Sequence, residues 1–234
     1  MKHPFLIALG AGAVVLLAAF LPALLQALRG GPPLPASSTV DAAPWQARAV
    51  PGGAVAAMGF TLPGSRLADA QARWPEELQV AVMAPRGEPG ALEAYLESYR
   101  EGGFAGRLVI VAEAAPEALS RWQARAARAE PVDGRTVRYT LNPDDRAEAL
   151  RAPLAGLTFI PGAQLDAATL QQRFGAPAER WASGERIEQW LYPDRGLAVA
   201  LDAEGREVLQ FVAPAEFERR LRAPLQASGA RRLP

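Results

Sequence analysis

The chain has 234 residues, half of them hydrophobic, and its 25 basic side chains are balanced by 25 acidic ones. It contains no cysteine, which excludes disulfides, thiolate catalysis and cysteine-ligated metal sites, and its only histidine is His3. A catalytic triad or a histidine general base in a folded domain is therefore excluded as well. The arginines are interspersed with carboxylates rather than clustered, so we expect no nucleic acid partner.

An uncharged apolar segment occupies residues 5–28, FLIALGAGAVVLLAAFLPALLQAL. As a helix it would reach about 36 Å, more than the ~30 Å hydrocarbon core of a bilayer. Positive charge precedes the segment, which predicts that the short N-terminal tail stays in the cytoplasm. We therefore expect a single-pass inner-membrane protein, held in the lipid bilayer through residues 5–28, with its C-terminal domain in the periplasm. A cleaved signal peptide and a buried core helix are the alternative interpretations.

Residues 29–44, RGGPPLPASSTVDAAP, follow the apolar segment. Proline, glycine, serine and other small residues dominate here, and such a composition cannot bury a core. We expect a flexible linker between the anchor and the globular part.

Residues 45–152 are predicted to form a first α/β unit. Strands are expected over 78–83, 107–113 and 135–141, where apolar residues alternate or run together. Helices are expected over 89–103, 116–129 and 143–150. The first of these is predicted because Leu92, Tyr95, Leu96 and Tyr99 have helical spacing.

Residues 153–226 are predicted to form a second, α+β unit. A helix over 166–174 is followed by three strands, RIEQWLY, LAVAL and EVLQFVA, joined by PDRG and DAEG turns that end in glycine. Tight turns between strands predict an antiparallel meander, and PAEFERRLRAPL predicts a closing helix. Residues 227–234 are expected to be a disordered tail. The predicted fold class is α+β, with helices packed on an antiparallel sheet, two tandem units as one possible arrangement, and one N-terminal transmembrane helix.

A similar phrase occurs twice, GFTLPGSRLADAQARWP at 59–75 and GLTFIPGAQLDAATLQQRFGAP at 156–177. In the second copy Asp166 is a candidate helix cap, and Gly175 with Pro177 ends the helix. In the first copy Ser65 is the candidate cap and Pro75 the stop. The repeated sequence predicts, in both places, a helix that packs on a sheet. Chance similarity in an alanine-rich chain is the alternative.

The region from 156 to 212 resembles the SmpA/OmlA (BamE-like) domain of bacterial envelope proteins. The residues that carry the resemblance are Gly162, Leu165, Asp166, Leu170, Phe174, Gly175, Pro177, Trp190, Tyr192, Asp202 and Gly205. The resemblance implies helices on a three- or four-stranded antiparallel sheet, in tandem as in the related beta-lactamase-inhibitor proteins, and protein binding without catalysis. The chain departs from the family because it lacks the cysteine on which the family lipoproteins are acylated.

Three aromatic residues around the meander are the candidate partner-binding residues: Trp181, Trp190 and Tyr192. Trp190 and Tyr192 share one face of their strand. If helices cover the opposite face, these rings are exposed and anchor a partner; if the faces are reversed, they belong to the core.

The carboxylates give no catalytic, cofactor or metal site. Glu185 and Glu188 fall on opposite faces of a strand, and Asp144 with Asp145 begins a helix, where carboxylates favour the helix dipole. Asp202 and Glu204 lie in a tight turn that lacks the ligands of a calcium loop.

The expected function is that of a membrane-anchored, envelope-associated periplasmic protein with a non-catalytic protein-binding domain. The alternatives are a small-ligand or peptidoglycan-binding domain with an aromatic-lined cleft, and a hydrolase that uses two converging carboxylates.

Overall fold

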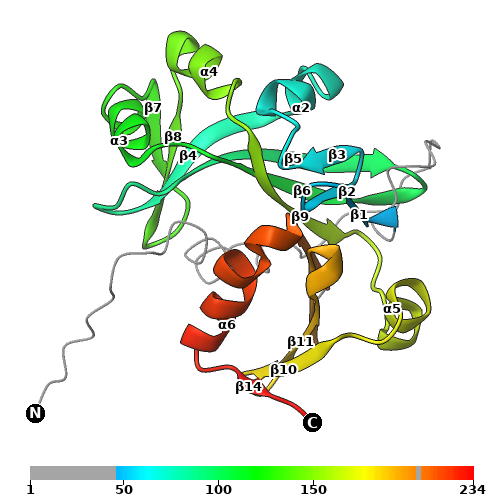
Figure 1. The fold of residues 1–234 in the computed structure, drawn as a ribbon. Helices are drawn as coiled ribbons and strands as arrows, with labels where there is room; N and C mark the ends of the chain where they lie inside the picture. The colour runs from blue at the N-terminus through cyan, green and yellow to red at the C-terminus, as the bar shows by residue number, and fades with distance from the viewer. Residues whose placement is uncertain (1–45, 204–206) are drawn as a thin grey trace, which may run out of the picture.

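The computed structural model describes residues 46–203 and 207–234 (Figure 1). Most of this part is one antiparallel sheet of eleven strands in the order β14-β10-β11-β12-β13-β9-β6-β5-β4-β8-β7. The strands are β4 (Gln79–Pro85), β5 (Ala91–Glu101), β6 (Phe104–Ala112), β7 (Arg128–Pro131), β8 (Thr136–Thr140), β9 (Leu154–Pro161), β10 (Glu179–Ser183), β11 (Ile187–Tyr192), β12 (Leu197–Asp202), β13 (Val208–Val212) and β14 (Arg231–Arg232).

A second, three-stranded sheet and several short helices accompany the large sheet. The small sheet contains β1 (Arg48–Val50), β2 (Ala54–Ala57) and β3 (Phe60–Leu62). The helices are α2 (Leu67–Arg73), α3 (Pro116–Ala124), α4 (Pro143–Ala149), α5 (Ala167–Phe174) and α6 (Ala223–Ala227), with short turns η3 (Pro193–Arg195), η4 (Pro214–Glu216) and η5 (Glu218–Arg222). The predicted meander appears as β11, β12 and β13, and the helices predicted from residues 116, 143 and 166 are α3, α4 and α5.

The predicted fold class is wrong, because a single wide sheet takes the place of helix-covered units. Strand β9 decides this: its residue Phe159 pairs with Leu108 of β6 on one side and with Leu209 of β13 on the other. Hydrogen bonds to both neighbours join residues 45–152 and 153–226 into one sheet.

The helix predicted over 89–103 is also wrong, since this stretch is the long strand β5. Leu92, Ala94 and Leu96 alternate into the core, and a bulge between Leu96 and Tyr99 shifts the phase so that Tyr99 is buried too. Apolar residues at 92, 96 and 99 therefore have helical spacing although they lie on one face of a bulged strand.

The main hydrophobic core lies on one face of the large sheet. The small sheet and helices α2 to α5 contribute to it, with Leu67, Leu119, Ala149, Leu170 and Phe174 among their buried side chains. The C-terminal helical segment, which consists of Phe217, η5 and α6, lies on the opposite face, which we call the second face (Figure 1). There Phe217 and Leu221 pack against the strand residues Trp181, Leu191, Ala198 and Val212.

Both copies of the repeated phrase form a strand followed by a helix, β3–α2 and β9–α5. Asp166 caps α5, accepting a hydrogen bond from the Thr169 amide at 2.6 Å. In the first copy the cap differs from the prediction. Arg66 holds the cap position, and its amide donates to Asp69 at 2.7 Å, while Ser65 accepts from the Thr61 amide.

The predicted transmembrane helix at 5–28 and the linker at 29–44 lie outside the described residues. Across 46–203 and 207–234, each helix is too short or too polar to cross a bilayer. The localisation as a single-pass inner-membrane protein is corrected accordingly. The tail predicted to be disordered contains β14, in which Arg231 and Arg232 pair with β10.

The turn after β11 requires glycine at 196. Gly196 has φ +59°, and a Cβ there would lie 1.9 Å from the carbonyl oxygen of Val212. Gly184 has a similar φ of +67°, but a Cβ there meets no atom within 4 Å. We expect Gly184→Ala to cost about 1 kcal/mol through backbone strain alone, and Gly196→Ala to cost at least about 2 kcal/mol more. Urea unfolding of the two variants measures this difference, and equal losses would contradict the close approach of Gly196 to β13.

Candidate functional site

The three aromatic residues predicted to bind a partner are buried. Trp181 is 8% exposed, Trp190 7% and Tyr192 5%. Trp190 and Tyr192 belong to the main core, and Trp181 packs under the C-terminal helical segment. Their burial agrees with the core alternative for these rings.

The polar atoms of these rings have partners within the fold. The Trp190 indole donates to Glu188 at 2.6 Å, and the Tyr192 hydroxyl donates to the Gly175 carbonyl at 3.0 Å. Glu188 also accepts from Arg180 at 2.5 Å, and this hydrogen bond holds the pKa of its carboxyl below the usual value. Glu188 therefore supports the aromatic core.

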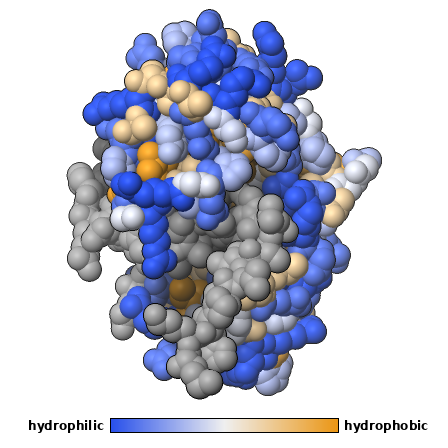
Figure 2. Space-filling view, turned by 90° about the vertical axis from the view of Figure 1, so that its left-hand side faces the viewer, coloured by the Kyte–Doolittle hydropathy of each residue, from blue (hydrophilic) through white to orange (hydrophobic). Residues whose placement is uncertain are grey.

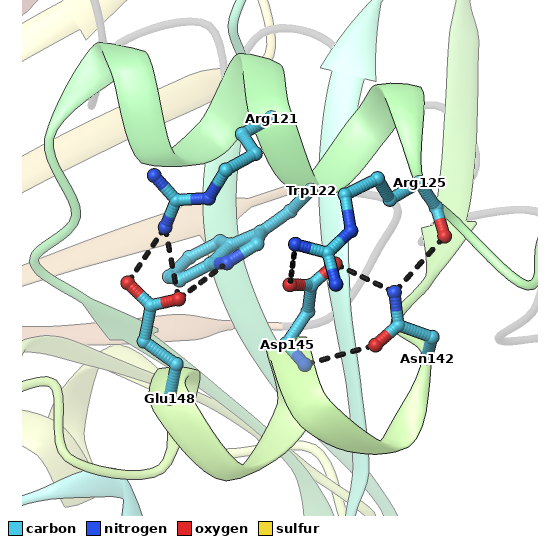
Figure 3. Close-up of polar contacts among 6 residues, drawn as sticks. All are labelled: Arg121, Trp122, Arg125, Asn142, Asp145 and Glu148. Carbon is cyan, nitrogen blue, oxygen red and sulfur yellow. Dashed lines mark hydrogen bonds and ion pairs between the residues drawn. The ribbon is translucent and has the colours of Figure 1, made fainter.

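Helices α3 and α4 lie side by side and are joined by two polar clusters (Figure 3). In one, Glu148 accepts from Arg121 at 2.7 and 2.8 Å and from the Trp122 indole at 3.4 Å. In the other, buried Asp145 accepts from Asn142 at 2.7 Å and faces Arg125 at 3.4 Å. Asn142 also caps α4 through the Asp145 amide. These contacts join the two helices, and they include Asp145, one of the two acidic residues predicted at the start of α4.

Glu93 is a buried carboxyl that belongs to neither of these clusters. It lies on β5 between Ala81 of β4 and Val111 of β6, on the second face of the sheet, and is 5% exposed. Burial raises its pKa to about 8, and the charge of Arg138 opposes this shift only in part. Within the described residues its Oε1 has no hydrogen-bond partner. Buried, incompletely bonded carboxyls of this kind are candidates for functional sites.

The neighbouring polar side chains on β5 form a separate group. The Tyr95 hydroxyl donates to Glu97, which also accepts from Arg107 at 3.0 Å. Burial and the bond to Glu97 raise the pKa of Tyr95. Glu97 is four residues from Glu93 along the strand, about 13 Å away, so the two carboxylates do not converge on one substrate atom. In 46–203 and 207–234, moreover, no three acidic or histidine side chains gather as a metal site would need.

Glu93 was not a candidate in the sequence, because residues 89–103 have helical spacing and Glu93 then falls on the exposed side. A strand assignment would have placed it on the face opposite Leu92 and Ala94. A strand assignment alone would still not have predicted that Glu93 is buried, because burial also depends on the packing against that face.

The two edges of the large sheet differ in chemistry. At one edge, β7 carries Arg128 and Glu130 and ends in Pro131, features that discourage pairing with another strand. At the other, β14 pairs with only Trp181 and Ala182 of the five-residue strand β10. Both residues of β14 are exposed.

Comparisons with known proteins identify no relative: no family model, curated protein or solved structure matches the chain. The resemblance to the SmpA/OmlA domain therefore stays a prediction.

Glu93 predicts a specific pH dependence of stability. Its folded pKa of about 8 lies above the ordinary value of 4.5, so the folded state binds more protons than the unfolded state between these pH values. Stability should therefore fall as pH rises from about 5 to 8, by at most roughly 1.4 kcal/mol per pH unit. We expect Glu93→Gln to remove this loss in urea unfolding, and Glu97→Gln, the matched control on the exposed part of β5, to retain it. An unchanged pH profile in Glu93→Gln would show that Glu93 is ionised in the folded protein.

Proposed function

We propose that the folded part of the chain is a non-catalytic protein-binding module that accepts an extended segment of a partner protein along the edge of β10. The observation that carries this proposal is that β14 pairs with only two residues of β10, Trp181 and Ala182. A strand added to a sheet edge gains backbone hydrogen bonds whatever its side chains, and neighbouring pockets select among sequences.

The hydrogen-bond register of β10 supports this role. Leu233 donates its amide to the Arg180 carbonyl at 2.8 Å. In an antiparallel pair every second residue bonds to the same neighbour, so Ala182 also directs its backbone groups toward β14. A partner strand that extends past Ser183 would pair with more of β10 than β14 does.

Displacement of β14 requires little disruption of the core. Its two side chains are exposed, whereas β10 is held by five pairs with β11, from Glu179–Leu191 to Ser183–Ile187. Arg222 of the C-terminal helical segment also binds Glu179 at 2.5 Å, so β10 remains anchored when β14 leaves. Weakly held terminal segments are the parts of a fold that open at lowest cost.

The chain's own C-terminus provides a defined probe of this edge. We expect a chain that lacks residues 229–234 to bind a synthetic peptide of residues 227–234 in fluorescence anisotropy, because the peptide restores β14. The full chain should bind at least about tenfold more weakly, because its edge is already covered. Absence of binding by a truncated chain with an unchanged circular dichroism spectrum would contradict an accepting edge.

A proline substitution separates edge pairing from non-specific adhesion. Ala182→Pro removes the amide that faces β14, and the pairing of Trp181 and Ser183 with β11 continues on the other side. We expect peptide binding to be lost in the truncated chain with Ala182→Pro and kept with Ala129→Pro, the matched change at the β7 edge. A photo-crosslinker at Ser183 in the source cells, compared with one at Glu130, would then identify the natural partner.

A further inference from the structure

The two faces of strand β10 carry different side chains. Alternation along the strand divides its residues into two sets: Glu179, Trp181 and Ser183 on the second face, and Arg180 and Ala182 on the main-core face. Trp181 belongs to the cluster under the C-terminal helical segment, whereas Arg180 pairs with the core residue Trp190 of β11. A strand added at this edge therefore meets a different set of side chains on each face.

The register of β14 places one arginine on each face. Strand β14 lies beside β10 (Figure 1), with Arg232 opposite Trp181 and Arg231 opposite Ala182. Because the Leu233 amide donates to the β10 backbone, the Arg232–Trp181 pair is one without backbone hydrogen bonds, in which opposite side chains come closest. Residues opposite each other share a face, so Arg232 is on the second face and Arg231 on the main-core face.

The second face carries an excess of negative charge near the position of Arg232. Glu179, two residues from Trp181, accepts from the Trp181 indole at 3.0 Å and from Arg222 at 2.5 Å. Arg222 also binds Glu218, so one guanidinium serves two carboxylates and the group retains one negative charge. The Glu179 side chain is only 12% exposed, which limits the screening of its charge. A carboxylate diagonal to the position opposite Trp181 favours a cation there.

The main-core face has balanced charge at the neighbouring position. Ala182 lies between Arg231 on β14 and Glu188 on β11. Arg180 binds Glu188 at 2.5 Å, so the positive and the negative group beside Ala182 compensate each other. A charged side chain opposite Ala182 therefore meets attraction and repulsion of similar size. We expect this position to distinguish only weakly between acidic and basic residues.

We propose that the β10 edge selects a partner strand that carries lysine or arginine at the position opposite Trp181. The inference rests on the proposed function, because it states which strands that edge accepts. Backbone hydrogen bonds form with any sequence, so the charge of the side chains supplies the selection. On the side of the molecule seen in Figure 2 the described surface is also mostly hydrophilic, with small separate apolar areas. Arg232 occupies the selected position in the chain's own β14.

The full chain tests this charge preference through its own β14. The Leu233 amide donates to the Arg180 carbonyl, so its hydrogen exchange reports how often β14 leaves the edge. We expect Arg232→Glu to speed this exchange at least about fivefold, and Arg232→Lys to leave the rate within about twofold. Arg231→Glu gives the same net charge as Arg232→Glu and should change the rate by no more than about twofold. Equal acceleration by the two glutamate variants would overturn the proposal, because it would show a general charge effect.

Binding of labelled peptides to the full chain separates this selection from the accepting edge itself. Peptides of residues 227–234 are compared in three forms: unchanged, with Arg231→Glu and with Arg232→Glu. We expect the first two to bind with affinities within about threefold of each other, and the Arg232→Glu peptide to bind at least about fivefold more weakly. Equal affinities of all three would overturn the selection and leave an edge that accepts any strand. Absence of binding by all three, to the full chain and to the chain lacking 229–234, would contradict the proposed function and the inference with it.

A substitution on β10 identifies the carboxylate that sets the preference. Glu179→Gln removes the charge and keeps an acceptor for the Trp181 indole, and Glu130→Gln at the β7 edge is the matched control. We expect the preference of the full chain for the unchanged peptide over the Arg232→Glu peptide to shrink at least about threefold in Glu179→Gln and to persist in Glu130→Gln. Each preference is a ratio measured within one variant, so a loss of stability that affects both peptides alike cancels. An undiminished preference in Glu179→Gln would overturn the proposal, since the charge of the second face would then not set it.

Discussion

The double pairing of β9 is the constraint on which the rest of the structure depends. Seven of its eight residues are buried, and it pairs with β6 along most of its length and with β13 over Gly156–Phe159. Gly106 allows the approach of β6, since a Cβ there would lie 2.3 Å from the Ile160 carbonyl oxygen. Without this junction the chain would form two small sheets, each of which its own helices could cover. With it, the sheet has two wide faces that must be kept from water.

The width of the sheet explains why its two faces are unequal. Helices α2 to α5 have seven to nine residues each and all pack on the main-core side, together with the small sheet. The C-terminal helical segment covers only one corner of the other side. The remaining strands nevertheless carry apolar residues on both faces, such as Leu108 and Val109 of β6. A strand with two apolar faces is suited to the middle of three layers.

Local patterns in the sequence predicted local structure well and the joining of distant segments poorly. Asp166, Gly175 and Gly196 identify the ends of α5 and a turn, because caps and left-handed turns depend on a few adjacent residues. The pairing of β9 with β6 depends on residues about fifty positions apart, and no local signal encodes it. Strand β5 was mistaken for a helix because its bulge gives helical spacing. Glu93 could not be recognised as a candidate for the same reason, and Trp190 and Tyr192 were ambiguous because their exposure depends on which face the helices cover.

The C-terminal end of the chain lies at the sheet edge that the proposed partner strand would occupy. The C-terminal residues Arg231 and Arg232 cover the β10 edge. A terminal segment can leave its place without breaking the chain's path through the core, so its removal costs only its own contacts. The small exposed cover at the edge therefore suits exchange with a partner strand. The edge is consequently the site at which a binding partner competes most easily.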